Sequence, residues 1–86
     1  MIVDVVGVSV LDGFRLRLTF EDGLEGEFDV AQEVGFDGVF APLRDPDYFR
    51  QASVNPDLGT VVWPNGADLD PVVLHARVQG RSVQVA

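Results

Sequence analysis

Cysteine and lysine are absent from the 86 residues of this chain, and histidine occurs once, as His75. Without cysteine the fold can hold neither a disulfide framework nor a thiolate metal site, and one imidazole excludes a site built from several histidines. Because lysine is absent, all six basic residues are arginines, and 14 acidic residues outnumber them. The resulting formal charge of −8 disfavours binding to nucleic acid and to anionic membrane surfaces.

Long apolar segments are missing as well. The run from Val5 to Leu11 contains Gly7 and Ser9 and is too short to span a membrane. No basic segment precedes it and an acid stands at Asp4, so we expect no targeting segment and a cytoplasmic location. Hydrophobic residues make up 47% of the chain and include many valines, which excludes disorder and favours strands.

The length supports one domain with a thin core, because a chain of this size buries only about 60–65% of its unfolded surface. No internal repeat and no linker divides the sequence. We place the single domain at residues 1–80 and expect residues 81–86 to form a C-terminal tail.

Apolar and polar residues alternate with a period of two in the segments 14–20 and 24–29, which predicts two half-buried strands. The residues between them, 21–23, end in a glycine. A three-residue loop there places Leu16 opposite Phe28 and keeps apolar residues together. A two-residue loop would place apolar residues opposite charged ones, so we predict the longer loop.

The opposite face of these two strands carries charges of both signs. The three-residue loop sets Arg17 opposite Glu27 and Arg15 opposite Asp29. Exposed cross-strand pairs of this kind contribute about 0.2–1 kcal/mol each. Glu25, Glu27 and Asp29 form either an acidic patch that binds a basic partner or a solvated sheet face. We favour the solvated face, and the short chain leaves little room for the cleft of a glycosidase.

The first strand follows from the same rule of pairing. A loop at residues 11–13 places Val10 opposite Phe14 and Val6 opposite Leu18. The result is a three-stranded antiparallel meander with one apolar side, which other elements must cover.

Three aspartates stand where a carboxylate caps the start of a helix, and two of them precede a proline, which is favoured at the first helical position. The predicted helices begin after Asp29, Asp45 and Asp70 and end near Gly35, Ala52 and Val78. Two further strands at 53–54 and 60–63 predict a hairpin. The expected class is α+β: an N-terminal three-stranded antiparallel meander from about Val3 to Val30, short helices, a second short β-hairpin and a C-terminal helix that Gly80 closes.

His75 lies on the last predicted helix, beside the apolar stripe of Leu74 and Val78. An imidazole in that place can serve as a general base or a ligand, or it can cover apolar surface at the edge of the core. No serine of the chain stands in the sequence context of a nucleophile elbow. We therefore interpret His75 as a boundary residue and predict no catalytic residue and no cofactor.

The most distinctive local string is Trp63-Pro64-Asn65-Gly66, in which Asn65-Gly66 is a strong turn signal. The tryptophan is either a core anchor, which a domain this small favours, or part of an exposed recognition surface. Asn65 and Asp68 offer hard oxygen ligands, but the spacing does not match a calcium-binding loop, so we predict no metal site. Trp63, Asn65 and Asp68 remain a candidate interaction or ligand loop.

Three segments carry a resemblance to known proteins: Phe20–Gly23, Leu43–Phe49 and Gly59–Pro71. Together they resemble a family of small bacterial proteins called domain of unknown function 2442. The resemblance covers about residues 3–75, and its most specific part is the tryptophan-proline-asparagine-glycine string with the aspartate-rich helix start that follows. It implies an α+β fold and no established activity.

Members of this family are often encoded beside another small uncharacterised protein, so the resemblance implies a partner role like that of an antitoxin. Some related chains carry an added helix-turn-helix segment. Only eight residues follow Val78 here, so we expect no direct binding to DNA.

Two functions of different kinds remain. The first is a non-enzymatic protein-interaction module whose partner is a small basic protein, because opposite net charges speed encounter. A homodimer through an edge strand of the meander is another form of association. The alternative is a small-ligand-binding or enzymatic domain that uses the loop Trp63–Asp70. It requires a concave site into which Asn65 and Asp68 point, and it loses its basis if both bond to their own turn.

Overall fold

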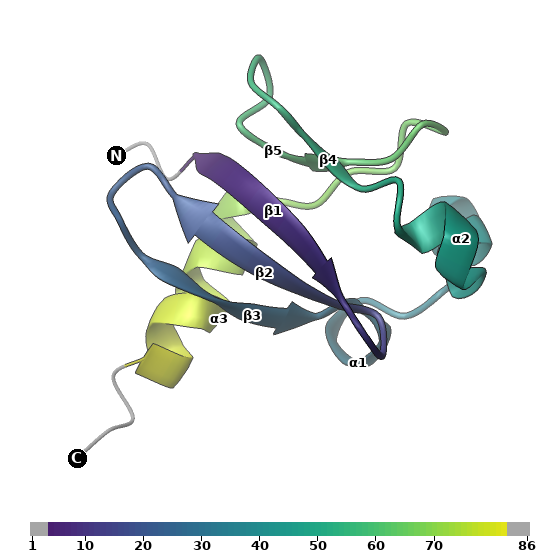
Figure 1. Cartoon of the computed structure of the whole chain (residues 1–86), viewed down its shortest axis with the longest axis horizontal. Coiled ribbons are helices and arrows are strands. Elements are labelled where there is room, and N and C mark those ends of the chain that lie inside the picture. The colour runs from purple at the N-terminus through teal and green to yellow at the C-terminus, as the bar shows by residue number, and fades with distance from the viewer. Residues whose placement is uncertain (1–3, 83–86) are drawn as a thin grey trace.

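The computed structural model describes residues 4–82, with the side chains of residues 4–80. Three antiparallel strands form the main sheet in the order β1-β2-β3, so β2 is central (Figure 1). Their bounds are β1 Val5–Leu11, β2 Arg15–Phe20 and β3 Glu25–Asp29. The predicted meander is confirmed, and its expected start at Val3 lies outside the described residues.

The register between β2 and β3 is the predicted one. Leu16 lies opposite Phe28, and the Phe20 N–H donates to the Leu24 carbonyl at 2.8 Å. Gly23 has a φ of 91°, a left-handed conformation that glycine adopts without strain. This register is strongly specified because a slip of one residue would turn every apolar side chain of the strand into solvent.

The register between β1 and β2 differs from the prediction by two residues. Val10 lies opposite Leu16 rather than Phe14, so the loop begins one residue later than expected. Phe14 has a φ of 62° in that loop, and its ring centroid lies 5.0 Å from that of Phe36 and 5.3 Å from that of Phe49. The prediction was wrong because aromatic contacts with distant segments hold Phe14 outside the strand.

A β-bulge near the start of β1 overturns a second expectation. Val5 pairs with Phe20 and Gly7 pairs with Thr19, so Val6 is an extra residue in the strand. A bulge changes which side chains point to the core. Val5 is therefore 1% exposed, whereas Val6, which was predicted to face the core, is 56% exposed.

Three helices begin at the predicted aspartate caps. The carboxylates of Asp29, Asp45 and Asp70 each accept a hydrogen bond of 2.9 Å from a backbone N–H two or three residues later. The helices are α1 Val30–Glu33, α2 Pro46–Phe49 and α3 Pro71–Ser82. A 3-10 helix between the first two, η1 Gly38–Arg44, was not predicted.

The second helix is shorter than predicted and ends before Ala52. The Phe49 carbonyl, which a longer helix would offer to residue 53, accepts a hydrogen bond from Trp63 Nε1 at 3.0 Å. The chain then forms the predicted hairpin, whose strands are β4 Ser53–Asn55 and β5 Thr60–Val62.

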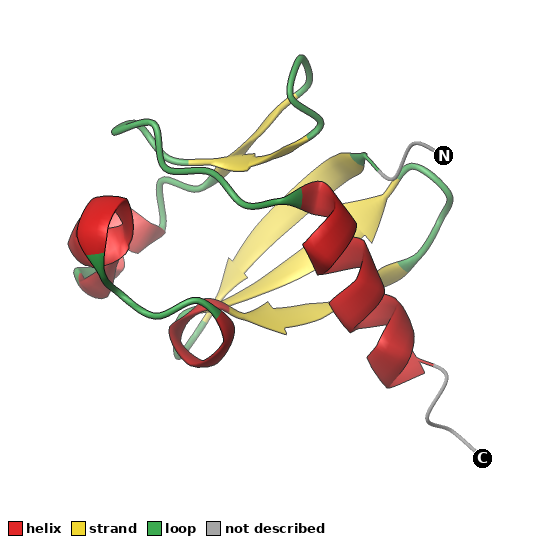
Figure 2. Ribbon diagram, turned by 180° about the vertical axis from the view of Figure 1, so that it is seen from behind, coloured by secondary structure: helices red, strands yellow, loops and turns green. Residues whose placement is uncertain are grey.

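The last helix, α3, covers one face of the main sheet (Figure 2). It packs closely on β3 at Gly26, where an added Cβ would lie 2.5 Å from Val78 Cγ1. Gly80 does not take the positive φ of a glycine cap, and the helix continues past it into the expected tail. The predicted closure was wrong because a glycine inside a helix costs only about 1 kcal/mol.

The core lies between the covered face of the sheet, α3 and the hairpin. Its large buried side chains are Leu16, Leu18, Phe20, Phe28, Leu43, Phe49, Trp63 and Leu74. They come from β2, β3, η1, α2 and α3 and from the loop after β5, so the second half of the chain is needed to cover the meander built by the first half.

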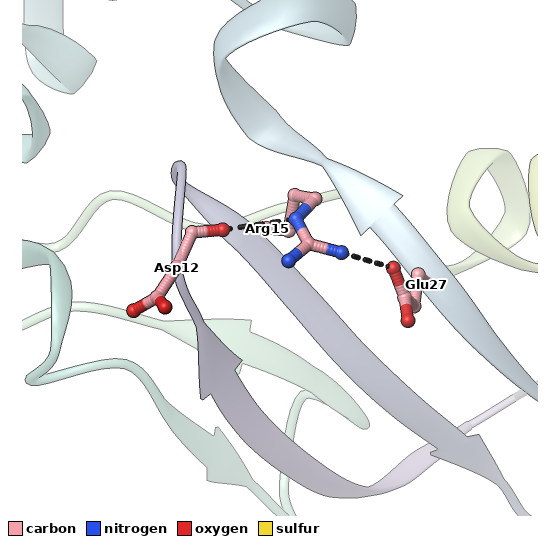
Figure 3. Close-up of polar contacts among 3 residues, drawn as sticks. All are labelled: Asp12, Arg15 and Glu27. Atoms are coloured by element: carbon pink, nitrogen blue, oxygen red, sulfur yellow. Dashed lines mark hydrogen bonds and ion pairs between the residues drawn. The ribbon is translucent and has the colours of Figure 1, made fainter.

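The other face of the sheet carries a charged row. Arg15 forms an ion pair with Glu27 (Figure 3), in which a guanidinium nitrogen lies 2.6 Å from a carboxylate oxygen, and Arg17 forms one with Glu25 at 3.0 Å. The residues stand opposite one another as predicted, but the ion pairs run diagonally across the strands. Asp29, the expected partner of Arg15, caps α1 instead, and Arg15 reaches the next acid along β3.

Candidate functional site

Trp63 is only 2% exposed. Its indole Nε1–H donates to the Phe49 carbonyl, and the centroids of the Trp63 and Phe49 rings lie 5.8 Å apart. A buried tryptophan whose N–H is bonded contributes mainly packing area. Trp63 therefore ties the end of α2 to β5 as a core anchor, and it offers a ligand no aromatic wall.

Both ends of the Asn65 side-chain amide are engaged. Its oxygen accepts a hydrogen bond from the Ala67 N–H at 3.1 Å, and its Nδ2 donates to the Val39 carbonyl at 2.9 Å. Gly66, at a φ of 89°, completes the turn. Asn65 thus holds its own turn and fastens it to η1.

Asp68 has an exposed side chain, and its carboxylate makes no hydrogen bond or ion pair with the part of the chain that the structure describes. Its backbone forms a bridge with Val62. Two hollows of the surface are lined by other residues, and neither includes Trp63, Asn65 or Asp68. The structure therefore does not bring the three predicted site residues together around a ligand.

No three histidine or acidic side chains among residues 4–80 come together as metal ligands would. Within the same part of the chain, the helices are too short or too polar to cross a bilayer.

A pair that sequence reasoning missed joins the loop between β2 and β3 to α3. His75 is 6% exposed, and its Nε2 lies 2.7 Å from Asp22 Oδ2. The other oxygen of Asp22 accepts a hydrogen bond from the Leu24 N–H at 3.0 Å. This backbone bond, followed by the bond to His75, lowers the pKa of Asp22 below its ordinary value.

The imidazole of His75 also packs edge-on against the Phe20 ring, with centroids 4.9 Å apart. The interpretation of His75 as a boundary residue is consistent with this packing, but its acidic partner was not foreseen. Asp22 lies 53 residues away and precedes a glycine, so a turn already accounted for it. Nothing local in the sequence indicates the pair, which exists because α3 lies across the sheet.

A small α+β domain results, with a three-stranded meander covered on one face by a helix and joined to a second hairpin. The family described as Protein of unknown function (DUF2442) matches residues 5–80, so the chain belongs to that family. This match confirms the resemblance seen in the sequence. Neither a curated protein nor a solved structure matches the chain.

Proposed function

We propose that this chain is a non-enzymatic protein-interaction module of the cytoplasm, and that its partner is a small basic protein, which it binds in the manner of an antitoxin. The observation that carries the proposal is a set of carboxylates that no cation among the side chains of residues 4–80 neutralises.

Most of the described arginines are already neutralised. Arg15, Arg17, Arg50 and Arg77 each lie within 3.0 Å of an acidic oxygen. Several carboxylates make no hydrogen bond or ion pair with residues 4–80. They are Asp4, Asp12, Glu21, Asp37, Asp57 and Asp68. Their field extends about 8 Å at physiological ionic strength, so it attracts a cationic partner and opposes contact with a second acidic chain.

The ligand-binding alternative receives less support. It needs polar groups that converge on a concave site. Asn65 is engaged on both sides of its amide, and Trp63 is buried. We therefore advance the interaction module alone.

The proposal is tested by capture from an extract of the native host, with the full chain as bait. We expect one basic protein at a stoichiometric ratio in low salt, and we expect it to be lost in high salt, where exposed charges are screened. Mass spectrometry identifies the protein and gives its ratio to the bait.

A matched bait carries Asp37→Asn, Asp57→Asn and Asp68→Asn, which remove three charges and no contact between described residues. It should recover less of the same protein than the unchanged chain does. Absence of any stoichiometric protein partner, or a partner that is acidic and indifferent to salt, would overturn the proposal.

A further inference from the structure

The outer edge of β1 has backbone groups that no other strand uses. Along an antiparallel strand, successive residues direct their N–H and C=O alternately to the two sides. The backbone N–H of Phe20 donates to the carbonyl of Leu24, which immediately precedes β3. The backbone groups of the even-numbered residues of β2 therefore face β3, and those of the odd-numbered residues face β1. The register of β1 on β2 then directs the backbone groups of Val8 and Val10 outward, away from the sheet.

The described part of the chain leaves these groups open. The β4–β5 hairpin lies on the side of β1 opposite β2 (Figure 1), and the Val5 N–H donates to the Gly59 carbonyl at 2.9 Å. Within residues 4–82, no backbone hydrogen bond joins Val8 or Val10 to the hairpin or to α2. The edge is fastened at its first residue only.

No charge guards this edge. From Val5 to Leu11 the strand contains only valine, glycine, serine and leucine. On the opposite edge strand, β3, the residues whose backbone groups face away from β2 are Glu25, Glu27 and Asp29. Charged side chains on an edge discourage the addition of another strand, and so does a β-bulge. Acids protect β3 along its length, whereas β1 has only the bulge at Val6, which leaves Val8 and Val10 without such protection.

Two hollows lie along the unguarded edge. The larger, of about 320 Å³, is lined by apolar atoms of Val6, Val54 and Pro56, among others. A cavity of roughly 150 Å³ holds a benzene molecule, so an apolar side chain fits there. The smaller, of about 110 Å³, lies at the far end of β1 between Phe14 and α2, and the Arg50 that borders it is paired with Asp47.

Carboxylates that no cation among the side chains of residues 4–80 neutralises lie near the larger hollow. Asp4 lines it, and the carbonyl of Asp4 accepts a hydrogen bond from the Glu21 N–H at 2.8 Å. Asp57 belongs to the turn that ends at Gly59, another lining residue. At the other end of β1, the Asp12 carboxylate points away from Arg15 (Figure 3). The edge is thus apolar along its length and acidic at its ends.

We propose that the edge of β1 takes an extended segment of the basic partner by strand addition. This proposal rests on the proposed function and names its surface. The segment bonds to the backbone of Val8 and Val10, places an apolar side chain in the hollow beside Val6, and places its cations against Asp4, Glu21 and Asp57. Main-chain bonds supply affinity, and the pocket and the charges supply specificity.

A second copy of this chain is the less suitable occupant. Each copy carries a formal charge of −8, and pairing two β1 edges would bring the acidic ends of both strands together. A basic segment removes that repulsion.

The test uses two matched variants, each of which places a carboxylate on an exposed valine: Val6→Asp on β1 and Val39→Asp on η1. The probe is a synthetic peptide of alternating lysine and valine, about six residues long. It is titrated into the ¹⁵N-labelled full chain, and amide shifts are followed by nuclear magnetic resonance. We expect shifts at the amides of β1 rather than β3. We expect Val6→Asp to weaken binding about tenfold or more, because it removes an apolar wall of the larger hollow, and Val39→Asp to leave it unchanged or slightly tighter.

The other outcomes overturn the inference. If both variants bind equally, or if the shifts fall on β3 or α3, charge alone brings the peptide to the chain. If the chain by itself forms a dimer that Val6→Asp dissolves, the edge belongs to a second copy. The capture experiment separates this failure from that of the proposed function. A Val6→Asp bait that recovers the same basic protein undiminished leaves the function standing and removes the β1 edge from it.

Discussion

The two edge strands of the sheet, β1 and β3, differ in how far charged side chains protect them from pairing with another strand. β3 carries acids at every outward position, and two of them are held by arginines of β2. β1 carries no charge along its length and has a bulge that turns Val6 into solvent. An apolar open edge invites another strand, and proteins ordinarily protect such edges. A domain that protects one edge and leaves the other open therefore points to the open edge as a surface for association.

The same contrast extends to what packs on each strand. β3 is pressed closely by α3, whereas β1 is bordered by the hollow beside the β4–β5 hairpin. The two sides of the sheet thus differ in how closely they are packed, and substitutions should have unequal effects on them.

The largest expected difference concerns a glycine in each edge strand. Gly26→Ala should destabilise the domain by about 1–3 kcal/mol, because the new Cβ would meet Val78 and force α3 to shift. Gly7→Ala, whose Cβ would lie 3.5 Å from Thr19, should leave stability unchanged or slightly raised. Urea unfolding followed by the fluorescence of Trp63, the single tryptophan, measures both. Equal effects would show that α3 does not press on β3.

Removing the acidic side chains from β3 should make its edge as open to strand addition as that of β1. The double variant Glu25→Val and Glu27→Val makes β3 an apolar edge, so we expect self-association that the unchanged chain does not show at the same concentration. Sedimentation velocity measures it. The control is Val72→Glu with Val73→Glu on α3, which alters exposed residues away from both edges and should leave the mass unchanged. A monomeric double variant would count against the role assigned to the acids.

Substitutions in the β2–β3 loop and in the β1–β2 loop should differ in how their effect on stability depends on pH. The pKa of Asp22 is lowered in the folded chain from an ordinary value of 3.8, chiefly by the Leu24 N–H and then by His75. Its stabilising effect is therefore present above that value and is lost as the pH falls through the lowered pKa. Asp22→Asn should destabilise the chain at neutral pH, and this difference should vanish in strong acid. Asp12→Asn, in the β1–β2 loop, removes a carboxylate that accepts no hydrogen bond from residues 4–80, and it serves as the control in urea unfolding across the same pH series.

The smallest expected effect comes from the exposed ion pairs that hold the acids of β3. Arg17→Gln should lower stability by about 0.2–1 kcal/mol, because Arg17 and Glu25 are both about half exposed. The loss should shrink in high salt. Arg44→Gln serves as the control, because among the described residues it removes only a long hydrogen bond to the Phe36 carbonyl. Two losses of equal size would mean that the pair adds nothing specific to β3.

The success of sequence reasoning follows the distance between interacting residues. The β2–β3 register was predictable because a three-residue loop and one buried face leave a single parity that keeps apolar residues together. The caps at Asp29, Asp45 and Asp70 were predictable because a carboxylate bonds within its own helix turn. Each of these features is complete within a few residues.

The candidate site was predicted less well for the same reason. Trp63, Asn65 and Asp68 are adjacent in the chain, but the first two are directed to Phe49 and Val39, in elements far away in sequence. The pair formed by the half-exposed Asp22 and the buried His75 could not be found at all, since nothing near either residue indicates the other.

The sequence by itself determined the α+β class, the membership of its family, the β2–β3 hairpin and the starts of the three helices. Tertiary structure alone decided the register and bulge of β1, the burial of Trp63 and the partner of His75. The first group depends on the alternation of apolar and polar residues and on hydrogen bonds within a helix turn. Both are visible along the chain. The second depends on contacts that form only after α2, α3 and the hairpin have packed against the sheet, and it includes the open edge on which the proposed interaction rests.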